Sequence, residues 1–320
     1  VMAAFGDGPE RMLSRKRFCF RALVDIACVC CVAVPVLIIN VVAQPFHRGF
    51  FCDDQSLMHP FKTDTVPTWL LVVVGMGLPI LSILLVECLL QKTTRCCVLV
   101  PTEIPPVPKS CSESSYRSII IFFFGAAITQ LLTETGKYSI GRLRPHFLDV
   151  CRPENVPSNC SDIFIMQDVC TGDDAVKMRQ ARLSFPSGHA SMSMYSAAFL
   201  MVYLQARLVV SQAKLLRPVL QVAVFTMAFF TCLSRVSDYK HHWSDVLGGS
   251  LLGIIVCFLI VVSMTDFHHP LLRRRRAPLT GSRKERLPMY RQDNTSTSSE
   301  MPSPGNEQGT IQVQVENQKL

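Results

Sequence analysis

Three short stretches of this sequence combine basic side chains, histidines and a glycine turn. They are KYSIGRLRP (137–145), PSGH (186–189) and SRVSDYKHHWSD (234–245). Lysine and arginine bind phosphate oxygens, and the planar guanidinium of arginine can do so through two parallel hydrogen bonds. A glycine turn that leads into a helix adds backbone N–H groups and the positive end of the helix dipole. Together these groups suit the binding and transfer of a phosphoryl group.

The histidines of these stretches supply the two further roles that the transfer needs. A neutral imidazole attacks phosphorus and forms a phosphohistidine, and a protonated imidazole donates to the departing alcohol oxygen. Histidine reaches both states near neutral pH because its ordinary pKa is about 6.5. Both His241 and His242 are candidates for the nucleophile. Asp245 lies four residues after His241 and three after His242, so a carboxylate that orients the nucleophile from the same helix face favours His241 only modestly.

Six apolar segments lie between and around these stretches and must position them. They are residues 20–42, 68–90, 118–135, 190–210, 218–233 and 246–265, of which the third and fifth are short. A helix needs about 20 mostly apolar residues to cross the hydrocarbon core of a bilayer. We therefore predict an all-α integral membrane bundle of six transmembrane helices.

Lysine and arginine residues indicate the orientation of this bundle. Those that flank the apolar segments on one predicted side are Arg11, Arg15, Lys16, Arg17, Lys92, Arg95, Lys109, Arg117, Lys214, Arg217 and Arg273 to Arg276. Because basic flanks tend to stay in the cytosol, both termini are predicted to be cytosolic. Connections 43–67, 136–189 and 234–245 then lie on the extracellular or lumenal face, where all three motif stretches emerge. We expect a multi-pass protein of the plasma membrane.

Composition divides the chain into three parts. Residues 1–17 are predicted to be a cytosolic tail, residues 18–267 the six-span membrane domain, and residues 268–320 a disordered cytosolic tail rich in polar residues. The net charge of +8 comes from the basic flanks and from connection 136–189, which is basic although it is predicted to lie outside the cytosol. No nucleic-acid partner is expected, because the basic residues follow the membrane topology. Homo-oligomerisation is left open.

The predicted exterior connections hold four cysteines and one glycosylation sequon. The cysteines are Cys52, Cys151, Cys160 and Cys170. Disulfides are expected in this oxidising compartment, and Cys151 is paired with either Cys160 or Cys170. Asn159 begins an Asn-Cys-Ser sequon and is a predicted glycosylation site.

The three stretches resemble the signature motifs of the lipid phosphate phosphatases, the integral type 2 phosphatidic acid phosphatases. The longer segments GRLRPHFLDVC and LSRVSDYKHHWSDVL resemble those of the animal phospholipid phosphatases in particular. The resemblance covers residues 17–267, and no motif residue departs from the pattern. It implies an enzyme that works without a metal or other cofactor.

The resemblance also implies a role for each motif position. The residues that it places at the phosphate are Lys137, Arg144, Ser187, Gly188 and Arg235. His189 is the implied acid for the leaving group, His241 the nucleophile and Asp245 its orienting partner. His242 falls on a position to which the pattern assigns no role.

The resulting prediction is a phosphatidate phosphatase that hydrolyses lipid phosphate monoesters in the membrane. The resemblance implies phosphatidic acid, lysophosphatidic acid, sphingosine 1-phosphate and ceramide 1-phosphate as substrates. Two alternatives remain: a membrane phosphatase for a soluble phosphate monoester, and a non-catalytic relative that binds lipid. A transporter or channel is disfavoured, because it predicts ionisable residues in mid-membrane, whereas the charges here gather at one surface.

Overall fold

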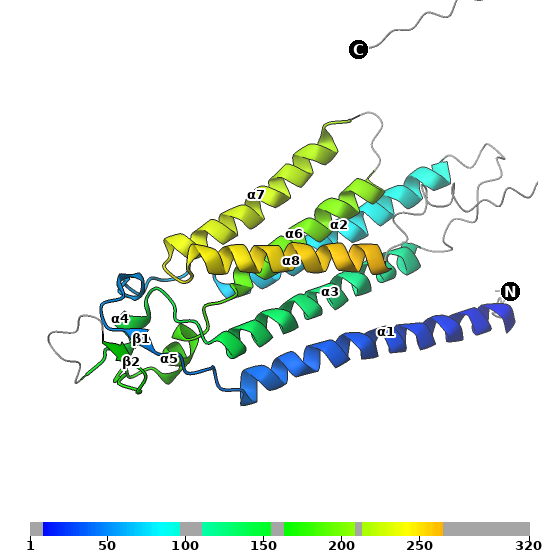
Figure 1. Ribbon diagram of the computed structural model, residues 1–320. Coiled ribbons are helices and arrows are strands. Elements are labelled where there is room, and N and C mark those ends of the chain that lie inside the picture. Colours follow the sequence, from blue (N-terminus) through cyan, green and yellow to red (C-terminus); the bar gives the residue numbers. More distant parts are fainter. Residues whose placement is uncertain (1–8, 97–110, 155–162, 209–212, 265–320) are drawn as a thin grey trace, which may run out of the picture. The chain divides into compact units, whose positions relative to one another are not determined.

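The computed structural model describes residues 9–96, 111–154, 163–208 and 213–264, which are mostly helical. Six long helices run roughly along one direction (Figure 1). They are α1 (Pro9–Val42), α2 (Thr68–Cys96), α3 (Cys111–Ile140), α6 (Gly188–Arg207), α7 (Leu216–Ser237) and α8 (Trp243–Met264). The short elements gather at one end of these helices (Figure 1): β1 (Phe50–Phe51), η1 (Gln55–Leu57), α4 (Phe147–Cys151), β2 (Phe164–Ile165) and α5 (Ala175–Ala181).

Five of the helices are long and apolar enough to cross a membrane. Their candidate spans are Arg17–Val42, Thr68–Leu90, Glu113–Ile140, Leu216–Ser237 and Trp243–Ser263. The third and fifth predicted segments, 118–135 and 218–233, are therefore longer than the sequence indicated. They lengthen because the helical backbone continues through polar residues at the span ends, which places Lys137 in the last turn of α3.

The fourth predicted segment, 190–210, corresponds to α6, which is not among these five. This helix contacts α2, α3, α7 and α8, so protein surrounds much of it. It accordingly contains buried serines and tyrosines in place of uniformly apolar residues, since protein neighbours can satisfy polar groups that lipid cannot.

Close packing of α8 against α6 fixes the start of α6. A Cβ atom on Gly249 would overlap the carbonyl group of Ser187, and one on Gly253 would overlap the carbonyl group of Ser191. Small residues at a helix interface allow this close approach of two backbones. The PSGH turn is thus held against the helix that follows His241.

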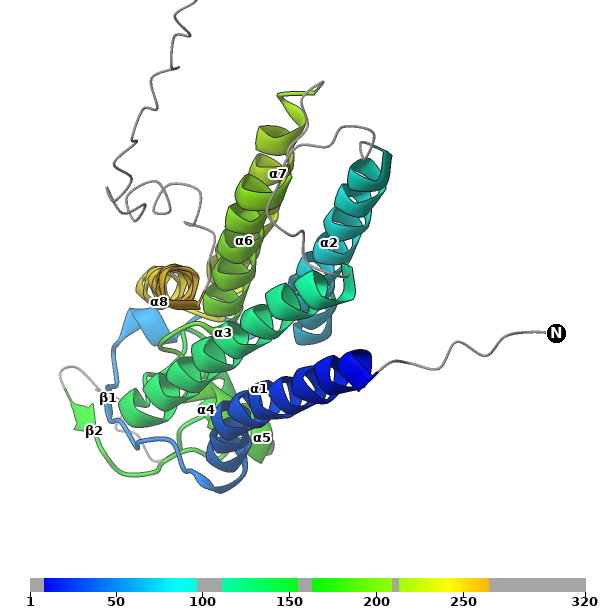
Figure 2. The same cartoon turned by 90° about the vertical axis from the view of Figure 1, so that its right-hand side faces the viewer.

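The remaining long helices complete the bundle around α6. Tyr195 of α6 stacks on Phe122 of α3 with ring centroids 5.7 Å apart, and its hydroxyl donates to the Phe122 carbonyl oxygen. Helix α1 packs along α3 on the side of the bundle away from α7 (Figure 2). It leaves most of its own apolar surface exposed, as expected for a helix that faces lipid.

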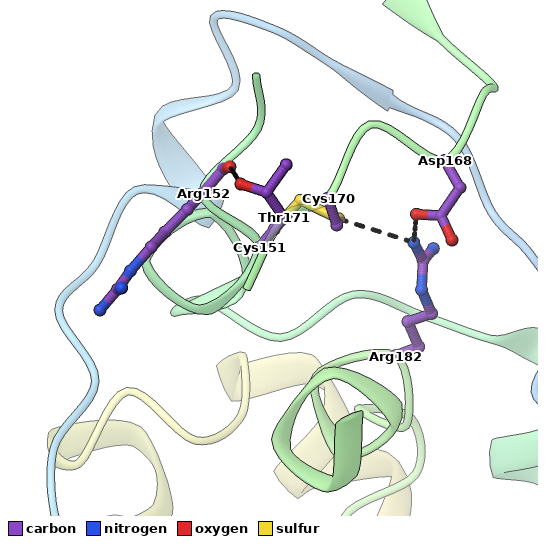
Figure 3. The surroundings of a disulfide bond; sticks show 6 residues. All are labelled: Cys151, Arg152, Asp168, Cys170, Thr171 and Arg182. Atoms are coloured by element: carbon purple, nitrogen blue, oxygen red, sulfur yellow. Dashed lines mark hydrogen bonds and ion pairs between the residues drawn. A yellow bond between two sulfur atoms is a disulfide. The ribbon is translucent and has the colours of Figure 1, made fainter. Parts of the chain in front are cut away.

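A small folded cap lies at the end of the bundle that holds the short elements. β1 and β2 pair antiparallel, with Phe50 opposite Ile165, over a core that includes the fully buried Phe147. Cys151 is joined to Cys170, which selects one of the two predicted alternatives (Figure 3). Cys52 is disulfide-bonded as well.

Some predictions fall outside the described residues. Asn159 and Cys160 lie between two described ranges, and the tail 268–320 follows the last of them. The N-terminal tail 1–17 is described only from Pro9, where it is already the first part of α1.

Candidate functional site

A cavity of about 750 Å³ lies at the cap end of the helices and brings the three motif stretches together. Six of the eight predicted catalytic and phosphate-binding residues line it: Lys137, Arg144, Gly188, His189, Arg235 and His241. The other two, Ser187 and Asp245, are fully buried beside it. Segments more than 100 residues apart thus meet at one site, because the end of α3, the start of α6 and the turn between α7 and α8 all contribute residues to the lining.

His241 lies in the turn between α7 and α8. Its backbone N–H donates to the carbonyl oxygen of Arg235, and Tyr239 takes a positive φ of 54° in this turn. The Nδ1 atom of His241 is 2.7 Å from the carbonyl oxygen of Ser184. A carbonyl oxygen can only accept, so Nδ1 holds the hydrogen and Nε2 is left with its lone pair.

The surroundings of His241 favour its neutral form. Burial lowers its pKa well below the ordinary value, and the nearby positive charges of Arg144 and Lys137 lower it further. A neutral imidazole with a free Nε2 lone pair is the form that can attack phosphorus.

Asp245 does not hold His241 directly. Its Oδ2 atom is 3.9 Å from Nδ1 of His241, an ion-pair distance that is too long for a hydrogen bond. Instead Asp245 accepts from the Ser184 hydroxyl at 2.5 Å, from Arg142 at 2.5 Å and from the backbone N–H of His242 at 3.0 Å. The predicted contact relied on helical spacing, but α8 begins only at Trp243, so His241 precedes the helix.

Arg235 is 1% exposed, and each of its guanidinium nitrogens has a partner. It donates to Asp64 at 2.8 Å, to Asp238 at 2.9 Å and to the Ser234 hydroxyl at 3.2 Å. The carboxylates neutralise a charge that is costly to bury alone. Asp64 comes from the predicted connection 43–67, which contains none of the three motifs.

Lys137 and Arg144 are the other two predicted phosphate-binding cations. Lys137 donates to Glu134 at 2.8 Å, and Glu134 also accepts from Gln130. Burial lowers the pKa of Arg144 to about 10, which still leaves the guanidinium charged at neutral pH. Among the described residues the buried Nε–H of Arg144 has no hydrogen-bond partner. That N–H is available to an anion in the cavity.

The PSGH turn forms the N-terminus of α6. The Ser187 hydroxyl caps the helix by accepting from the backbone N–H of Ala190, and the Ser187 N–H donates to the Asp245 carbonyl oxygen. Gly188 leaves room for Lys137, whose Nζ would be 3.1 Å from a Cβ atom at that position. His189 donates from Nε2 to the carbonyl oxygen of Val66 at 3.1 Å, so Nδ1 is the ring nitrogen that is left to exchange a proton.

The sequence motifs give no site role to Asp64 and Lys240, two of the charged residues that line this cavity. Asp64 was missed because a single acid in a long connection gives no spacing signal. Lys240, which immediately precedes His241, was missed because the motif pattern gives that position no role. Among the described residues no group of three or more His, Cys, Asp or Glu side chains is arranged to hold a metal ion.

Comparison with known proteins gives the family. A sequence profile of the PAP2 superfamily matches residues 118–268. Phospholipid phosphatase 1 of Rattus norvegicus is 43% identical over 245 residues, which are 77% of this chain and 85% of the relative. The chain belongs to the PAP2 superfamily. Its matched range contains all three motif stretches, from α3 to α8.

Other relatives of this PAP2 member are also named phospholipid phosphatases. Phospholipid phosphatase 2 of Homo sapiens is 39% identical over 253 residues, covering 79% of this chain and 85% of the relative. Phospholipid phosphatase 1 of Mus musculus is 39% identical over 258 residues, covering 80% and 88%. The family predicted from the three motifs is therefore confirmed. No solved structure matches the chain significantly.

Proposed function

We propose that this PAP2 member hydrolyses lipid phosphate monoesters through a phosphohistidine on His241, without a metal ion. Its membership in a family whose relatives are named phospholipid phosphatases makes it a phosphatase. The proposed substrates are phosphatidic acid, lysophosphatidic acid, sphingosine 1-phosphate and ceramide 1-phosphate.

The observation that supports a lipid substrate most directly is the lining of the cavity. Its polar end contains the side chains of Lys137, Arg144, Arg235 and Lys240. Much of its remaining lining is apolar and comes from four helices: Val29, Ala33, Val36 and Leu37 of α1, Leu71, Val72 and Met76 of α2, Phe123, Ala126 and Ala127 of α3, and Met192 of α6. A cationic end joined to an apolar chamber complements a phosphate headgroup with an acyl chain. A soluble sugar phosphate has no group for the apolar part.

The proposed reaction begins with attack on phosphorus by Nε2 of His241. The N–P bond forms as the P–O bond to the alcohol breaks, and His189 gives its Nδ1 proton to the departing oxygen. Lys137, Arg144 and Arg235 stabilise the negative charge on the phosphoryl oxygens. Water then attacks phosphorus while His189, now neutral, takes its proton. The N–P bond breaks, and inorganic phosphate and the original neutral His241 result.

Ser184 and Asp245 are proposed to act together on the nucleophile. The Ser184 carbonyl oxygen holds Nδ1–H of His241, and Asp245 holds the Ser184 hydroxyl. This fixes the tautomer that exposes Nε2, and the carbonyl dipole stabilises the imidazole as it gains positive charge. Asp245 would thus orient His241 through Ser184. Ser187 is proposed to act indirectly. Its hydroxyl caps α6 and its N–H donates to the Asp245 carbonyl oxygen, which holds the N-terminus of α6 at the cavity.

We also propose a topology that suits this chemistry. Helix α6 forms the sixth span in the middle of the bundle, shielded from lipid by its neighbours. The site then opens at the extracellular or lumenal face of the plasma membrane, both termini are cytosolic and Asn159 is glycosylated. The disulfide between Cys151 and Cys170 supports an oxidising compartment for the cap.

The test is phosphate release by the purified protein in detergent micelles containing EDTA. Wild type should release phosphate from phosphatidic acid but hardly any from glucose 6-phosphate, and His241→Ala should release none. His242→Ala should retain much of the activity, because it loses only one contact to Asp245. Comparable activity on the sugar phosphate would favour a soluble substrate. A folded wild type that hydrolyses neither would favour the non-catalytic alternative.

A further inference from the structure

Asp64 occupies the phosphate end of the cavity and pairs with a cation that the proposed substrate needs. Its Oδ1 atom accepts from Arg235 at 2.8 Å, and the Asp64 side chain lines the same cavity as His241 and His189. Because the other two guanidinium nitrogens of Arg235 already donate to Asp238 and Ser234, a phosphate oxygen that approaches from the cavity meets the position that Asp64 holds.

The two carboxylates on Arg235 differ in how firmly they are held. Asp238 is buried, and it also accepts from the backbone N–H of Thr65 at 2.8 Å and from the Thr65 hydroxyl at 2.7 Å. The Asp64 side chain is 40% exposed. Asp238 is therefore a fixed partner of Arg235, whereas the Asp64 carboxylate can leave into solvent.

The backbone around Asp64 is held by its neighbours, whereas its side chain is partly exposed. Thr65 is bound to Asp238, and the carbonyl oxygen of Val66 accepts from His189. On the other side, Phe61 donates its N–H to Asp149, and its ring lies under the ammonium group of Lys240 at 3.7 Å. Exchange of Asp64 for another anion thus requires only a side-chain rotation.

The charge of the cavity supports such an exchange. The described side chains that line it include four cations, Lys137, Arg144, Arg235 and Lys240, and two carboxylates, Asp64 and Glu134. Before His189 takes up the proton that it gives to the leaving group, the net charge of these side chains is two positive. A phosphate monoester dianion has a charge of the same size and opposite sign. Glu134 is buried and held by Gln130 and Lys137, so Asp64 is the carboxylate that can move.

We propose that Asp64 is a displaceable counter-ion of Arg235. It neutralises the guanidinium in the empty site, gives way to the substrate phosphate, and returns to Arg235 as inorganic phosphate leaves. Asp64 thereby weakens the binding of product phosphate and speeds its release, which makes it a residue that sets phosphate affinity. This inference rests on the proposed function, because it assigns the phosphate to Arg235.

The test is the affinity of the purified protein for inorganic phosphate, measured by titration calorimetry in detergent at pH 7.5. Asp64→Asn removes the competing charge and should lower the dissociation constant about five-fold, the scale of one partly exposed ion pair. Asp64→Glu keeps a carboxylate and should bind phosphate as weakly as wild type. The matched control is Asp168→Asn, which removes an exposed carboxylate paired with Arg182 outside the cavity and should change nothing.

The outcomes separate this inference from the proposed function, because phosphate binding requires no turnover. Unchanged or weaker phosphate binding by folded Asp64→Asn overturns the counter-ion role, even if wild type hydrolyses phosphatidic acid. No phosphate binding by either protein overturns it as well. If Asp64→Asn does not fold, Asp64→Ser serves the same comparison. A tighter dissociation constant in a protein with no lipid phosphatase activity would uphold the counter-ion and contradict the proposed substrate.

Discussion

The Nδ1 atom of His241 lies 2.7 Å from the carbonyl oxygen of Ser184, so a backbone group and not a carboxylate sets the tautomer of this histidine. The Ser184 hydroxyl in turn lies 2.5 Å from Asp245. Ser184 thus links His241 to Asp245, although it lies outside all three motif stretches.

Removal of the Ser184 hydroxyl tests this link. Ser184→Ala keeps the carbonyl oxygen but loses the hydrogen bond to Asp245, so kcat should fall about ten-fold, equivalent to about 1.4 kcal/mol, with little change in KM. Steady-state kinetics on phosphatidic acid measure both constants. A loss as large as that of His241→Ala would mean that the hydroxyl takes part in the chemistry, and no loss would mean that Asp245 acts by another route.

The guanidinium of Arg144 should be required for its shape as well as its charge. Arg144→Lys keeps a cation but removes the buried Nε–H that has no partner among the described residues, so kcat/KM should fall at least about a hundred-fold, the cost of about two charge-assisted hydrogen bonds. The control is Arg152→Lys, an exposed position outside the cavity, which should keep full activity. Equal activity of Arg144→Lys and wild type would remove Arg144 from the phosphate site.

The buried His146 should make the free energy of unfolding decrease in mild acid. Burial lowers its pKa to about 4, assisted by Arg144 and Lys240 and opposed by Asp149, while Nδ1 contacts the Tyr239 carbonyl oxygen. Below a pH of about 6.5, the ordinary pKa of histidine, His146 binds a proton in the unfolded chain but not in the folded protein. The free energy of unfolding therefore falls as the pH drops from about 6.5 to 4, by up to about 3 kcal/mol for this residue.

Thermal unfolding between pH 7.5 and pH 4 measures this effect. His146→Gln keeps a hydrogen-bond donor but cannot titrate, so its midpoint should fall less in acid than that of wild type. His47→Gln changes an exposed histidine and should follow wild type. Parallel curves for wild type and His146→Gln would show that His146 does not contribute to the acid sensitivity.

Glu87 should be needed for folding but not for chemistry. It is buried in α2 and accepts from Tyr203 at 3.0 Å and from Arg207 at 2.7 to 2.9 Å, which joins α2 to α6 at the end of the bundle away from the cavity. Glu87→Leu leaves Arg207 without its carboxylate and should cost about 3 kcal/mol of stability. The activity per folded molecule should stay at the wild-type level.

The double variant Glu87→Leu, Arg207→Leu provides the control for this pair. It removes both charges and should recover part of the lost stability, because the single variant leaves one charge unpaired near the bundle interior. Thermal midpoints in the same detergent give the comparison. Equal destabilisation by single and double variants would argue that the loss comes from packing alone.

The sequence predicted the components of the site better than their contacts. Charged residues at span ends gave the convergence of Lys137, His189 and His241, because apolar segments of known length fix which ends share a level. The partner of His241 could not be predicted, since it is a backbone carbonyl group brought close by the fold. Asp64 was missed for the same reason: its meeting with Arg235 depends on the path of a long connection.

The fold was predicted from hydropathy, and the prediction was limited to what hydropathy can show. Hydropathy reveals helices that face lipid, so α1, α2 and α8 were found close to their observed spans. It says less about α6, whose neighbours are other helices and whose serines and tyrosines therefore need no lipid contact. Hydropathy also does not show that α8 begins only at Trp243. The distance between Asp245 and His241 could therefore not be predicted from helical spacing.

The most direct measurement is to trap the phosphoenzyme. His189→Ala should form the intermediate from a substrate whose leaving group needs no proton, such as p-nitrophenyl phosphate, and should then hydrolyse it slowly. After rapid quenching in alkali, where phosphohistidine survives, tandem mass spectrometry should locate the phosphoryl group on His241, and the double variant His189→Ala, His241→Ala should contain none. A phosphoryl group on any other residue, or turnover with no trapped group in His189→Ala, would contradict the proposal that His241 is the nucleophile.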